Sequence, residues 1–212
     1  MNDINVTTQD WKKQQRMRLR KLRLGISATQ RAQWSHAITL ALLKGFPVFE
    51  RQRIGFYWPY QGEYDPIPAM AHLHTRGATL ALPKVIGKNT PLRFIKWWPE
   101  AVMSQGKYGI SFPANTQEIA IDSLIVPLLG FDEQGYRLGY GSGYFDRTLA
   151  AMNPPPLTVG VAFEALRLPT IHPQPHDIPM DYIVTEQSIF LRTSSGLTPL
   201  PIADCASRNQ GV

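Results

Sequence analysis

From residue 53 onward, the chain alternates short runs rich in β-branched and aromatic residues with helical or loop-like segments. This alternation is typical of domains in which helices connect the parallel strands of one sheet. The 212 residues suffice for one large domain with a substantial core. We therefore predict an α/β fold, a single three-layer αβα domain with a mostly parallel sheet. Its strands are expected near residues 53–58, 79–82, 92–97, 123–128, 157–163 and 181–185.

Two helices are predicted before the first strand. Apolar residues from Trp11 to Ile26 recur at helical spacing beside a stripe of lysines and arginines, which indicates an amphipathic basic helix. A capping-box pattern at residues 27–30 begins the second helix, and Gly45 followed by Pro47 ends it. A third helix is predicted between Asp65, as its N-cap, and Gly77.

The remaining segments carry weaker signals. Residues 99–120 contain Pro and Gly and residues 164–180 contain several Pro, both without a clear period, so we predict that they are substrate loops. Residues 1–8 are polar, and residues 194–212 contain Ser, Gly and Pro, which is typical of flexible tails. The domain is therefore expected to span residues 9–193.

Composition restricts the class of protein. The 22 Lys and Arg residues against 16 Asp and Glu give a net charge of +6, which favours anionic partners but does not separate nucleotides from nucleic acid or lipid. One cysteine, Cys205, excludes an internal disulfide framework and fits a reducing compartment. We found no leader-like N-terminus and no apolar run near the ~20 residues that cross a bilayer, and we expect a cytoplasmic protein without a membrane partner.

The segment 137–147, RLGYGSGYFDR, follows a buried strand and precedes a predicted helix. Glycines at every second position let successive backbone N–H groups face one concavity, and the helix dipole adds positive potential there. The pattern is neither a P-loop nor a dinucleotide fingerprint. It predicts either an anion site or merely a tight strand-to-helix connection. Asp146, in the first helical turn, either complements the dipole or holds Mg²⁺ against phosphates.

A longer segment, PLLGFDEQGYRLGYGSGYFDR at residues 127–147, resembles the signature of the 5-formyltetrahydrofolate cyclo-ligase family, also called methenyltetrahydrofolate synthetases. The resemblance continues in order from about Lys12 to Glu186. It includes GEYD at 62–65, ALP at 81–83, LP at 168–169, HD at 176–177 and IVTE at 183–186. It implies a fold of the NagB/RpiA/CoA-transferase type, ATP and Mg²⁺ as cofactors, and a monomer that acts on a small folate rather than on nucleic acid.

The resemblance also implies roles for individual residues. Lys12 and Arg16 match a basic pair that contacts ATP phosphates, and their i, i+4 spacing places both on one helix face. Glu63 matches an acidic residue that contacts folate, Trp58 matches a residue lining the pterin pocket, and Asp146 and Asp177 match Mg²⁺ ligands. The nucleotide loop comprises Gly139, Tyr140, Gly141, Ser142, Gly143, Tyr144, Phe145 and Asp146, and the residues expected to act in catalysis are Lys12, Arg16, Glu63, Arg137 and Tyr144.

Some residues have no assigned role or depart from the family pattern. Arg18, Arg20, Lys21 and Arg23 match no function, and we interpret them as a solvated helix face. Ser142, Phe145, Pro66 and Phe112 replace the residues that are more frequent in relatives, which leaves the substrate preference open. We further expect Arg147 and Tyr144 to help close the site.

The implied reaction converts 5-formyltetrahydrofolate, possibly polyglutamylated, to 5,10-methenyltetrahydrofolate with cleavage of ATP to ADP and phosphate. Phosphorylation of the formyl oxygen would create an iminium phosphate that N10 attacks, so the protein mainly supplies positioning and charge. Two alternatives remain. One is a divergent relative that binds ATP but acts on another metabolite or regulates. The other is a nucleic-acid-binding protein that uses the basic helix together with Trp11 and Trp34.

Overall fold

The computed structural model describes residues 7–210 of the chain, and its α-helices up to residue 151 lie where the sequence predicts them. Ser27 accepts a hydrogen bond from the backbone N of Gln30 and begins the second helix, as predicted. Asp65 accepts one from the backbone N of Ile67. The helices are α1 (Thr8–Leu24), α2 (Ala28–Gly45), α3 (Ile67–Thr75), α4 (Tyr144–Ala151) and α5 (Ile202–Arg208), with 3-10 turns at Pro47–Arg51, Lys107–Gly109 and Glu164–Leu166.

Eight strands form the central sheet of the described part. Five neighbouring strands run parallel, and antiparallel strands flank them at both edges. The mostly parallel sheet that the sequence predicts is therefore confirmed. In spatial order the strands are β13 (Gly196–Leu200), β12 (Ile189–Thr193), β11 (Tyr182–Val184), β9 (Leu157–Val161), β6 (Ser123–Pro127), β1 (Arg53–Gly55), β2 (Thr79–Lys84) and β3 (Arg93–Trp97).

Two smaller sheets were not predicted. One consists of β10 (Arg167–Leu168), β7 (Gly130–Asp132) and β8 (Arg137–Leu138), and the other of β4 (Met103–Gln105) and β5 (Ser111–Pro113). Their strands are only two or three residues long, so they carry no readable alternation of apolar and polar residues. They lie in or beside the segments that the sequence marks as irregular.

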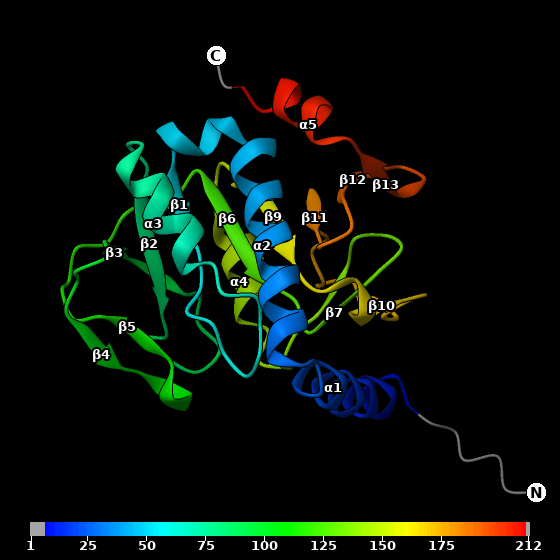
Figure 1. The fold of residues 1–212 in the computed structure, drawn as a ribbon. Coiled ribbons are helices and arrows are strands. Elements are labelled where there is room, and N and C mark those ends of the chain that lie inside the picture. The colour runs from blue at the N-terminus through cyan, green and yellow to red at the C-terminus, as the bar shows by residue number, and fades with distance from the viewer. Residues whose placement is uncertain (1–6, 211–212) are drawn as a thin grey trace, which may run out of the picture.

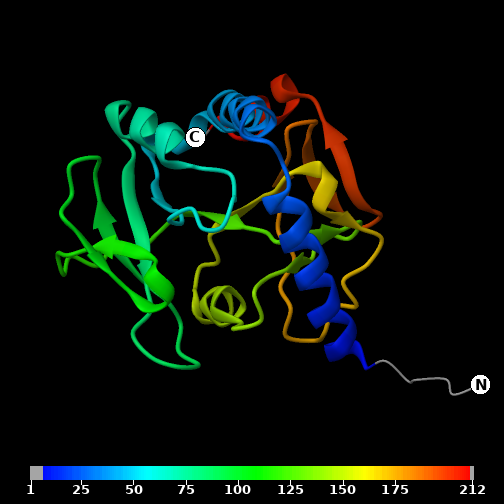
Figure 2. The same cartoon turned by 60° about the horizontal axis from the view of Figure 1, so that its bottom comes forward.

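Helices cover both faces of the central sheet (Figure 1). Helices α2, α3 and α5 lie over one face and α4 over the other, as Figure 2 shows. The strand side chains divide in the same way, because successive residues of a strand point to opposite faces. Leu80 and Leu82 belong to one buried cluster and Ala81 to the other. Two cores, one on each face, confirm the three-layer αβα architecture.

The C-terminal segment corrects one prediction. The sequence suggested a flexible tail at residues 194–212, but β13 extends the sheet and α5 packs against α2. Cys205 of α5 is fully buried and lies 3.5 Å from the point where a Cβ on Gly45 would stand. The predicted tail at residues 1–8 falls largely outside the described residues, and α1 begins at Thr8.

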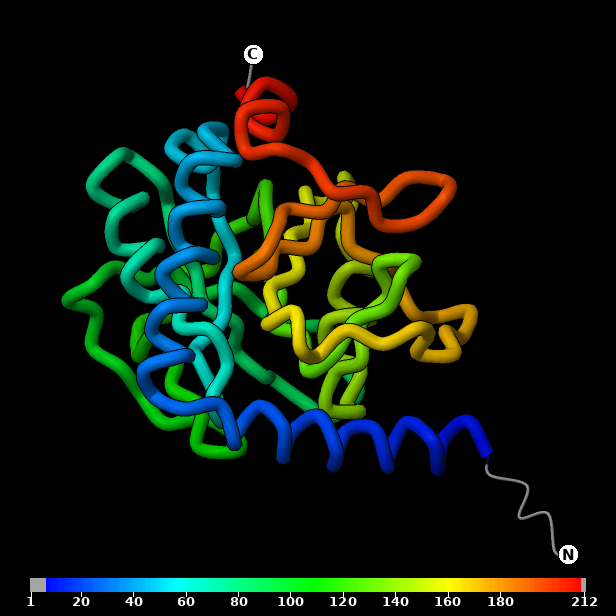
Figure 3. Tube along the Cα trace, turned by 45° about the vertical axis from the view of Figure 1, so that its right-hand side comes forward, coloured from blue at the N-terminus to red at the C-terminus, as the bar shows by residue number. Residues whose placement is uncertain are grey.

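Helix α1 lies along one edge of the domain as a separate rod, and α2 rises from its end (Figure 3). Its Leu19 is fully buried against the small sheet, near Gly130 and Leu168. Within residues 7–210, no helix combines the length and the apolar character that crossing a bilayer requires.

Candidate active site

A cavity of about 1270 Å³ lies at the carboxyl ends of the parallel strands. Residues at or just beyond the ends of β1, β2 and β6 line it, among them Tyr57, Val85 and Pro127. Strand β1 connects through α3 to β2 on one side, whereas β6 leads to β9 on the other. The strand order therefore reverses between β1 and β6, and ligands of open α/β sheets bind outside such a switch point.

The glycine-rich loop forms one wall of this cavity. It leaves β8 at Leu138 and enters α4 at Tyr144. Gly141 has φ +95° and Gly143 has φ +62°, a region that L side chains rarely adopt. Gly143 is also the N-cap of α4, so the loop ends at the positive end of that helix, as an anion site requires.

Arg147 and Tyr144 support the loop. Nη2 of Arg147 donates to the carbonyl of Ser142 at 2.6 Å, and its Nη1 lies 2.8 Å from where a Cβ of Gly143 would stand. The guanidinium also lies over the ring of Tyr144 at 5.2 Å from the ring centroid. Tyr144 lines the cavity, and its hydroxyl approaches the carbonyl of Gly87 at 3.4 Å. Their expected part in closing the site stays a prediction.

Lys12 and Arg16 of α1 reach the same wall, as their spacing suggests. Nε of Arg16 donates to the carbonyl of Gly139 at 2.8 Å, and its guanidinium carbon lies 3.3 Å from the position of a Cβ on Gly141. Nζ of Lys12 lies 3.0 Å from Oδ2 of Asp177. Burial lowers the pKa of Arg16, although Asp177 opposes that shift. The two cations and the loop thus form one positively charged wall.

Asp146 and Asp177 are held close to this wall by cations. Nη2 of Arg137 lies 2.5 Å from Oδ1 of Asp146, which also accepts the backbone N–H of Ile178 at 3.2 Å. Burial lowers the pKa of Arg137, although its pairing with Asp146 works in the opposite direction. Among residues 7–210, no cluster of three or more His, Cys, Asp or Glu could hold a metal by itself. The donor set fits only a cation that takes its remaining ligands from water or a bound phosphate.

Glu63 is buried, with 4% of its side chain exposed, at the opposite end of the loop. Its Oε2 accepts the backbone N–H of Tyr60 at 2.9 Å, and its Oε1 accepts the hydroxyl of Tyr140 at 2.7 Å. Nη1 of Arg23 lies 3.6 Å from Oε1. Burial raises the pKa of Glu63, although Arg23 and the two hydrogen bonds counteract this shift.

One sequence interpretation changes here. The sequence placed Arg23 on a solvated face, which is wrong, because Arg23 is 1% exposed and contacts Glu63 and Tyr140. The expected contact of Tyr140 with a nucleotide stays a prediction, and the hydroxyl of Tyr140 donates to Glu63. The other unassigned basic residues of α1, Arg18, Arg20 and Lys21, are exposed as predicted.

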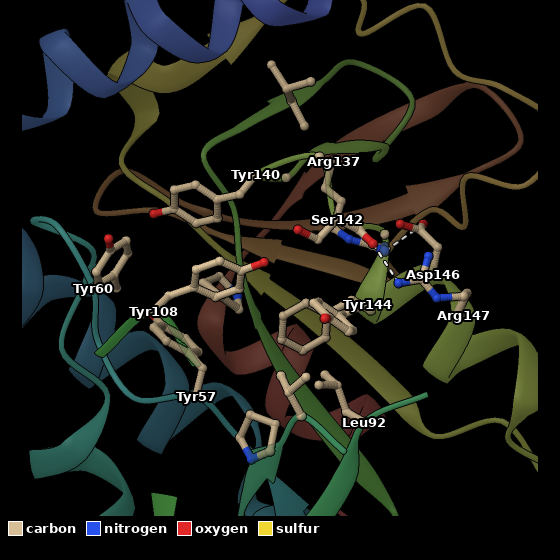
Figure 4. Close-up of a pocket in the computed structure, with 18 of the residues that line it drawn as sticks. Tyr57, Tyr60, Leu92, Tyr108, Arg137, Tyr140, Ser142, Tyr144, Asp146 and Arg147 are labelled. Carbon is tan, nitrogen blue, oxygen red and sulfur yellow. Dashed lines mark hydrogen bonds and ion pairs between the residues drawn. The ribbon is translucent and has the colours of Figure 1, made fainter. Parts of the chain in front are cut away.

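The two ends of the cavity differ in character (Figure 4). The rings of Tyr57, Tyr60, Tyr108 and Tyr140 gather at one end, whereas Asp146 and Arg147 lie at the other. Trp58, half-buried, also lines the cavity, as do Phe112 and Phe145. One end therefore suits a flat aromatic ligand and the other suits phosphate groups.

Both irregular stretches contribute to the cavity. Lys107 and Tyr108 reach it from the turn before β5, and Gln174, His176 and Asp177 reach it from the loop before β11. Tyr108 has φ +65°, which is uncommon for a residue other than glycine. The sequence carried no signal for Tyr60, Lys107 or Tyr108, since each lies in a segment without periodicity.

The geometry disfavours the nucleic-acid alternative. Trp11 meets His172 edge-on at 4.6 Å between ring centroids, and Trp34 lies 5.4 Å from Phe163. Both tryptophans pack against the main core. Lys12, Arg16 and Arg23 are turned toward the cavity and its walls, so α1 does not offer the continuous basic and aromatic surface that this alternative needs.

Known proteins of one family resemble this chain. Residues 8–186 match the model of the 5-formyltetrahydrofolate cyclo-ligase family. A protein of that name from Haemophilus influenzae is 30% identical over 178 residues, which cover 80% of this chain and 95% of the relative. One from Mus musculus is 24% identical, with 86% and 97% covered.

Solved structures show the same likeness. The NMR structure of Aquifex aeolicus 5,10-methenyltetrahydrofolate synthetase superposes with a TM-score of 0.75 at 29% identity, covering 90% of this chain and 96% of that one. A 5,10-methenyltetrahydrofolate synthetase from Mycoplasma pneumoniae, with a TM-score of 0.69 and 22% identity, covers 82% and 98%. The second likeness supports the fold alone.

Proposed function

Because the chain belongs to the 5-formyltetrahydrofolate cyclo-ligase family, we propose that it converts 5-formyltetrahydrofolate to 5,10-methenyltetrahydrofolate at the expense of ATP. One observation carries the proposal. The glycine loop contacts Arg16 through Gly139 and Glu63 through Tyr140, so the expected nucleotide and folate residues share one cavity.

The charged end of the cavity is the proposed triphosphate site. Backbone N–H groups of residues 139–143, the N-terminus of α4, Lys12 and Arg16 supply positive potential around it. Such a site stabilises the charge that shifts between the β- and γ-phosphates during transfer.

The aromatic end is the proposed pteridine site. Glu63 is the carboxylate there, and each of its oxygens already accepts one protein donor. A carboxylate offers about four acceptor positions in all. Two remain for adjacent N–H groups at the edge of a pteridine ring, which would pair in parallel. Trp58 and Tyr57 supply the apolar surface beside it.

Asp146 and Asp177 would hold Mg²⁺ between the protein and the phosphates. The metal would neutralise charge on the transferred phosphoryl group. The chain's own contribution is to keep both carboxylates in place, through Arg137 for Asp146 and Lys12 for Asp177.

The reaction needs positioning rather than a protein nucleophile. In the proposed sequence, the formyl oxygen attacks the γ-phosphorus of ATP, the β–γ bridging P–O bond breaks, and ADP leaves. N10 then attacks the formyl carbon and loses its proton, and the C–O bond breaks to release phosphate. Holding the two reactants in line within one cavity lowers the barrier to the first step.

A divergent relative that acts on another small metabolite is the second candidate. Three of the four departures from the family pattern, Phe112, Ser142 and Phe145, line the cavity. The fourth, Pro66, is buried beside α3 instead. Departures within the cavity are those that would alter substrate preference.

Mixing the purified protein with Mg-ATP and 5-formyltetrahydrofolate tests both candidates. We expect the near-ultraviolet absorbance of the methenyl product to appear, and to appear much more slowly with Lys12→Ala. Lys21→Ala, an exposed change on the same helix, is the matched control and should behave as the unchanged protein. ATP binding without product would favour the divergent relative.

A further inference from the structure

A chain of three polar side chains joins α1, the glycine loop and the turn that carries Glu63. Nη2 of Arg23 lies 2.5 Å from the hydroxyl oxygen of Tyr140, and this hydroxyl lies 2.7 Å from Oε1 of Glu63. Since a guanidinium only donates, the phenol accepts from Arg23 and donates to Glu63. Tyr140 lies 117 positions from Arg23 and 77 from Glu63 in sequence.

Arg23 also supports the turn itself. Its Nε donates to the carbonyl of Gln61 at 3.1 Å. Gln61 has φ +50° and Gly62 has φ +78°, so the turn before Glu63 contains two consecutive residues in the left-handed region. A non-glycine residue persists there only when its surroundings hold it. Arg23 therefore fixes the backbone of the turn as well as the carboxylate.

The burial of Arg23 beside Glu63 carries a desolvation cost. Arg23 is 1% exposed, and its Nη1 lacks a hydrogen bond of good geometry among the described residues. Burying a guanidinium and a carboxylate removes both from water. Tyr140 lines the cavity and is 44% exposed, whereas its hydroxyl is turned away from the phosphate end toward Glu63.

We propose that Arg23 and Tyr140 are positioning residues that hold the Glu63 carboxylate for the pteridine, and that Tyr140 thereby joins the nucleotide loop to the substrate end of the cavity. The inference rests on the proposed function for the identity of the ligand. It assigns the Tyr140 side chain to the folate end although its backbone belongs to the nucleotide loop. Its neighbour Gly139 accepts a hydrogen bond from Arg16, and a Cβ on its other neighbour, Gly141, would stand 3.3 Å from the guanidinium carbon of Arg16. A shift of the loop would therefore move the hydroxyl.

The test separates the two ligands by measuring their affinities one at a time. Tyr140→Phe removes only the hydroxyl. Calorimetric titration with 5-formyltetrahydrofolate should show Kd raised about tenfold or more, the size expected for a lost hydrogen bond to a charged group. Kd for ATP measured alone should stay within about twofold. In a Glu63→Gln background, Tyr140→Phe should add little, because two residues that act through one contact are not additive.

Matched variants separate positioning from general stability. Tyr64 follows Glu63 in sequence, and its buried hydroxyl forms a hydrogen bond with Thr39 at 2.8 Å. Tyr64→Phe removes this hydroxyl. It should leave Kd for 5-formyltetrahydrofolate unchanged. Arg23→Lys keeps the charge and should recover part of the affinity that Arg23→Met loses. Unchanged or tighter folate binding by Tyr140→Phe would overturn the proposal.

A readout without ligand tests the positioning independently. The backbone N–H of Tyr60 donates to Glu63, so its NMR shift and hydrogen-exchange rate report on the carboxylate. We expect the shift to change and exchange to accelerate in Tyr140→Phe but not in Tyr64→Phe. If the unchanged protein bound no folate while Tyr60 responded in this way, the proposed function would fail and the positioning would stand. A Tyr60 amide that does not respond overturns the positioning whatever the ligand.

Discussion

Lys12 and Asp177 form an ion pair, with Nζ 3.0 Å from Oδ2, although 165 positions separate them in sequence. One is the expected phosphate contact and the other an expected metal ligand. Both side chains are mostly buried, with 12% and 15% exposed, so each restrains the other when no ligand is bound. Binding of Mg-ATP would then exchange this pair for contacts with the phosphates and the metal.

Asp177→Asn should separate the affinity for free ATP from that for Mg-ATP. Without metal, the released Lys12 should bind ATP several-fold more tightly than in the unchanged protein, because the competing carboxylate charge is gone. Addition of Mg²⁺ should increase the ATP affinity of the variant much less than it increases that of the unchanged protein. Calorimetry with ATP in EDTA and in excess Mg²⁺ measures both. Glu118→Gln, which breaks an exposed pair with Arg93, should change neither, and weaker metal-free binding by Asp177→Asn would contradict the prediction.

Arg16→Ala should weaken ATP binding by about tenfold to a hundredfold, the size expected for a lost hydrogen bond to a charged group together with the released loop. Arg16 holds the carbonyl of Gly139 at 2.8 Å, so its loss affects both charge and loop geometry. Arg18→Ala, an exposed arginine that bonds Gln15 on the same helix, is the control. Equal ATP affinities for the two variants, measured by titration, would exclude a phosphate role for Arg16.

Gly141→Ala should weaken ATP binding and lower the free energy of unfolding by about 1–2 kcal/mol, because an L residue at φ +95° is strained. The new methyl group would also lie 3.3 Å from the guanidinium carbon of Arg16. Gly25→Ala is the matched control, since Gly25 has φ −77° and meets its nearest atoms at 3.4 Å. Urea unfolding and ATP titration measure the two effects. A Gly141→Ala protein as stable as Gly25→Ala would contradict the strain.

Affinity for 5-formyltetrahydrofolate should fall as the pH is lowered through the raised pKa of Glu63, which lies above 4.5. Burial raises the pKa of Glu63, whereas Arg23 and the hydrogen bonds from Tyr140 and the Tyr60 backbone lower it. Burial, followed by the negative charge on Glu63, raises the pKa of Tyr57. Protonated Glu63 offers fewer acceptor positions to the pteridine. Glu63→Gln should bind 5-formyltetrahydrofolate weakly and should lack this part of the pH dependence. The pH dependence that remains in the variant reports the titration of the ligand itself and can be subtracted.

The raised pKa of Glu63 also affects stability, with a sign opposite to that of a carboxylate whose pKa is lowered by an ion pair. A raised folded pKa means that the folded state binds the proton more tightly, so ionised Glu63 reduces stability above that pKa. This cost disappears as the pH falls below 4.5, the value for the unfolded chain. The substitution Glu63→Gln should therefore stabilise the protein more at neutral pH than at pH ~4, when the free energies of unfolding of the variant and the unchanged protein are compared at each pH. The opposite trend in urea unfolding would contradict the raised pKa.

Local signals account for the parts of the fold that the sequence predicted. The Ser27 cap acts within three residues, and the parallel strands of the central sheet are continuous apolar runs, because both of their faces are buried. Strands β7 and β8 could not be predicted, since they exist only through pairing with each other and with β10. The C-terminal tail was misjudged because polar composition does not show that Cys205 and Asn209 are buried.

The site divides in the same way. Lys12, Arg16 and Glu63 were expected from a resemblance, and the structure places all three along one cavity. Arg23 was missed because it follows Arg20 at a spacing of three and so continues the basic stripe of Lys12, Arg16 and Arg20. Its partners lie 38 and 117 positions away. Helix periodicity describes the exposure of one helix in isolation, and it carries no information about a loop that later covers one side chain.

Helices α1 and α5 stand at opposite sides of the domain (Figure 1), and only α1 borders the cavity. A fluorescent reporter or a surface anchor joined beyond α5 would leave the mouth of the cavity open to solvent. The same attachment before α1 would crowd Gln9 and Lys12, which line that mouth. Single-molecule or biosensor formats of this protein should therefore be tethered beyond α5.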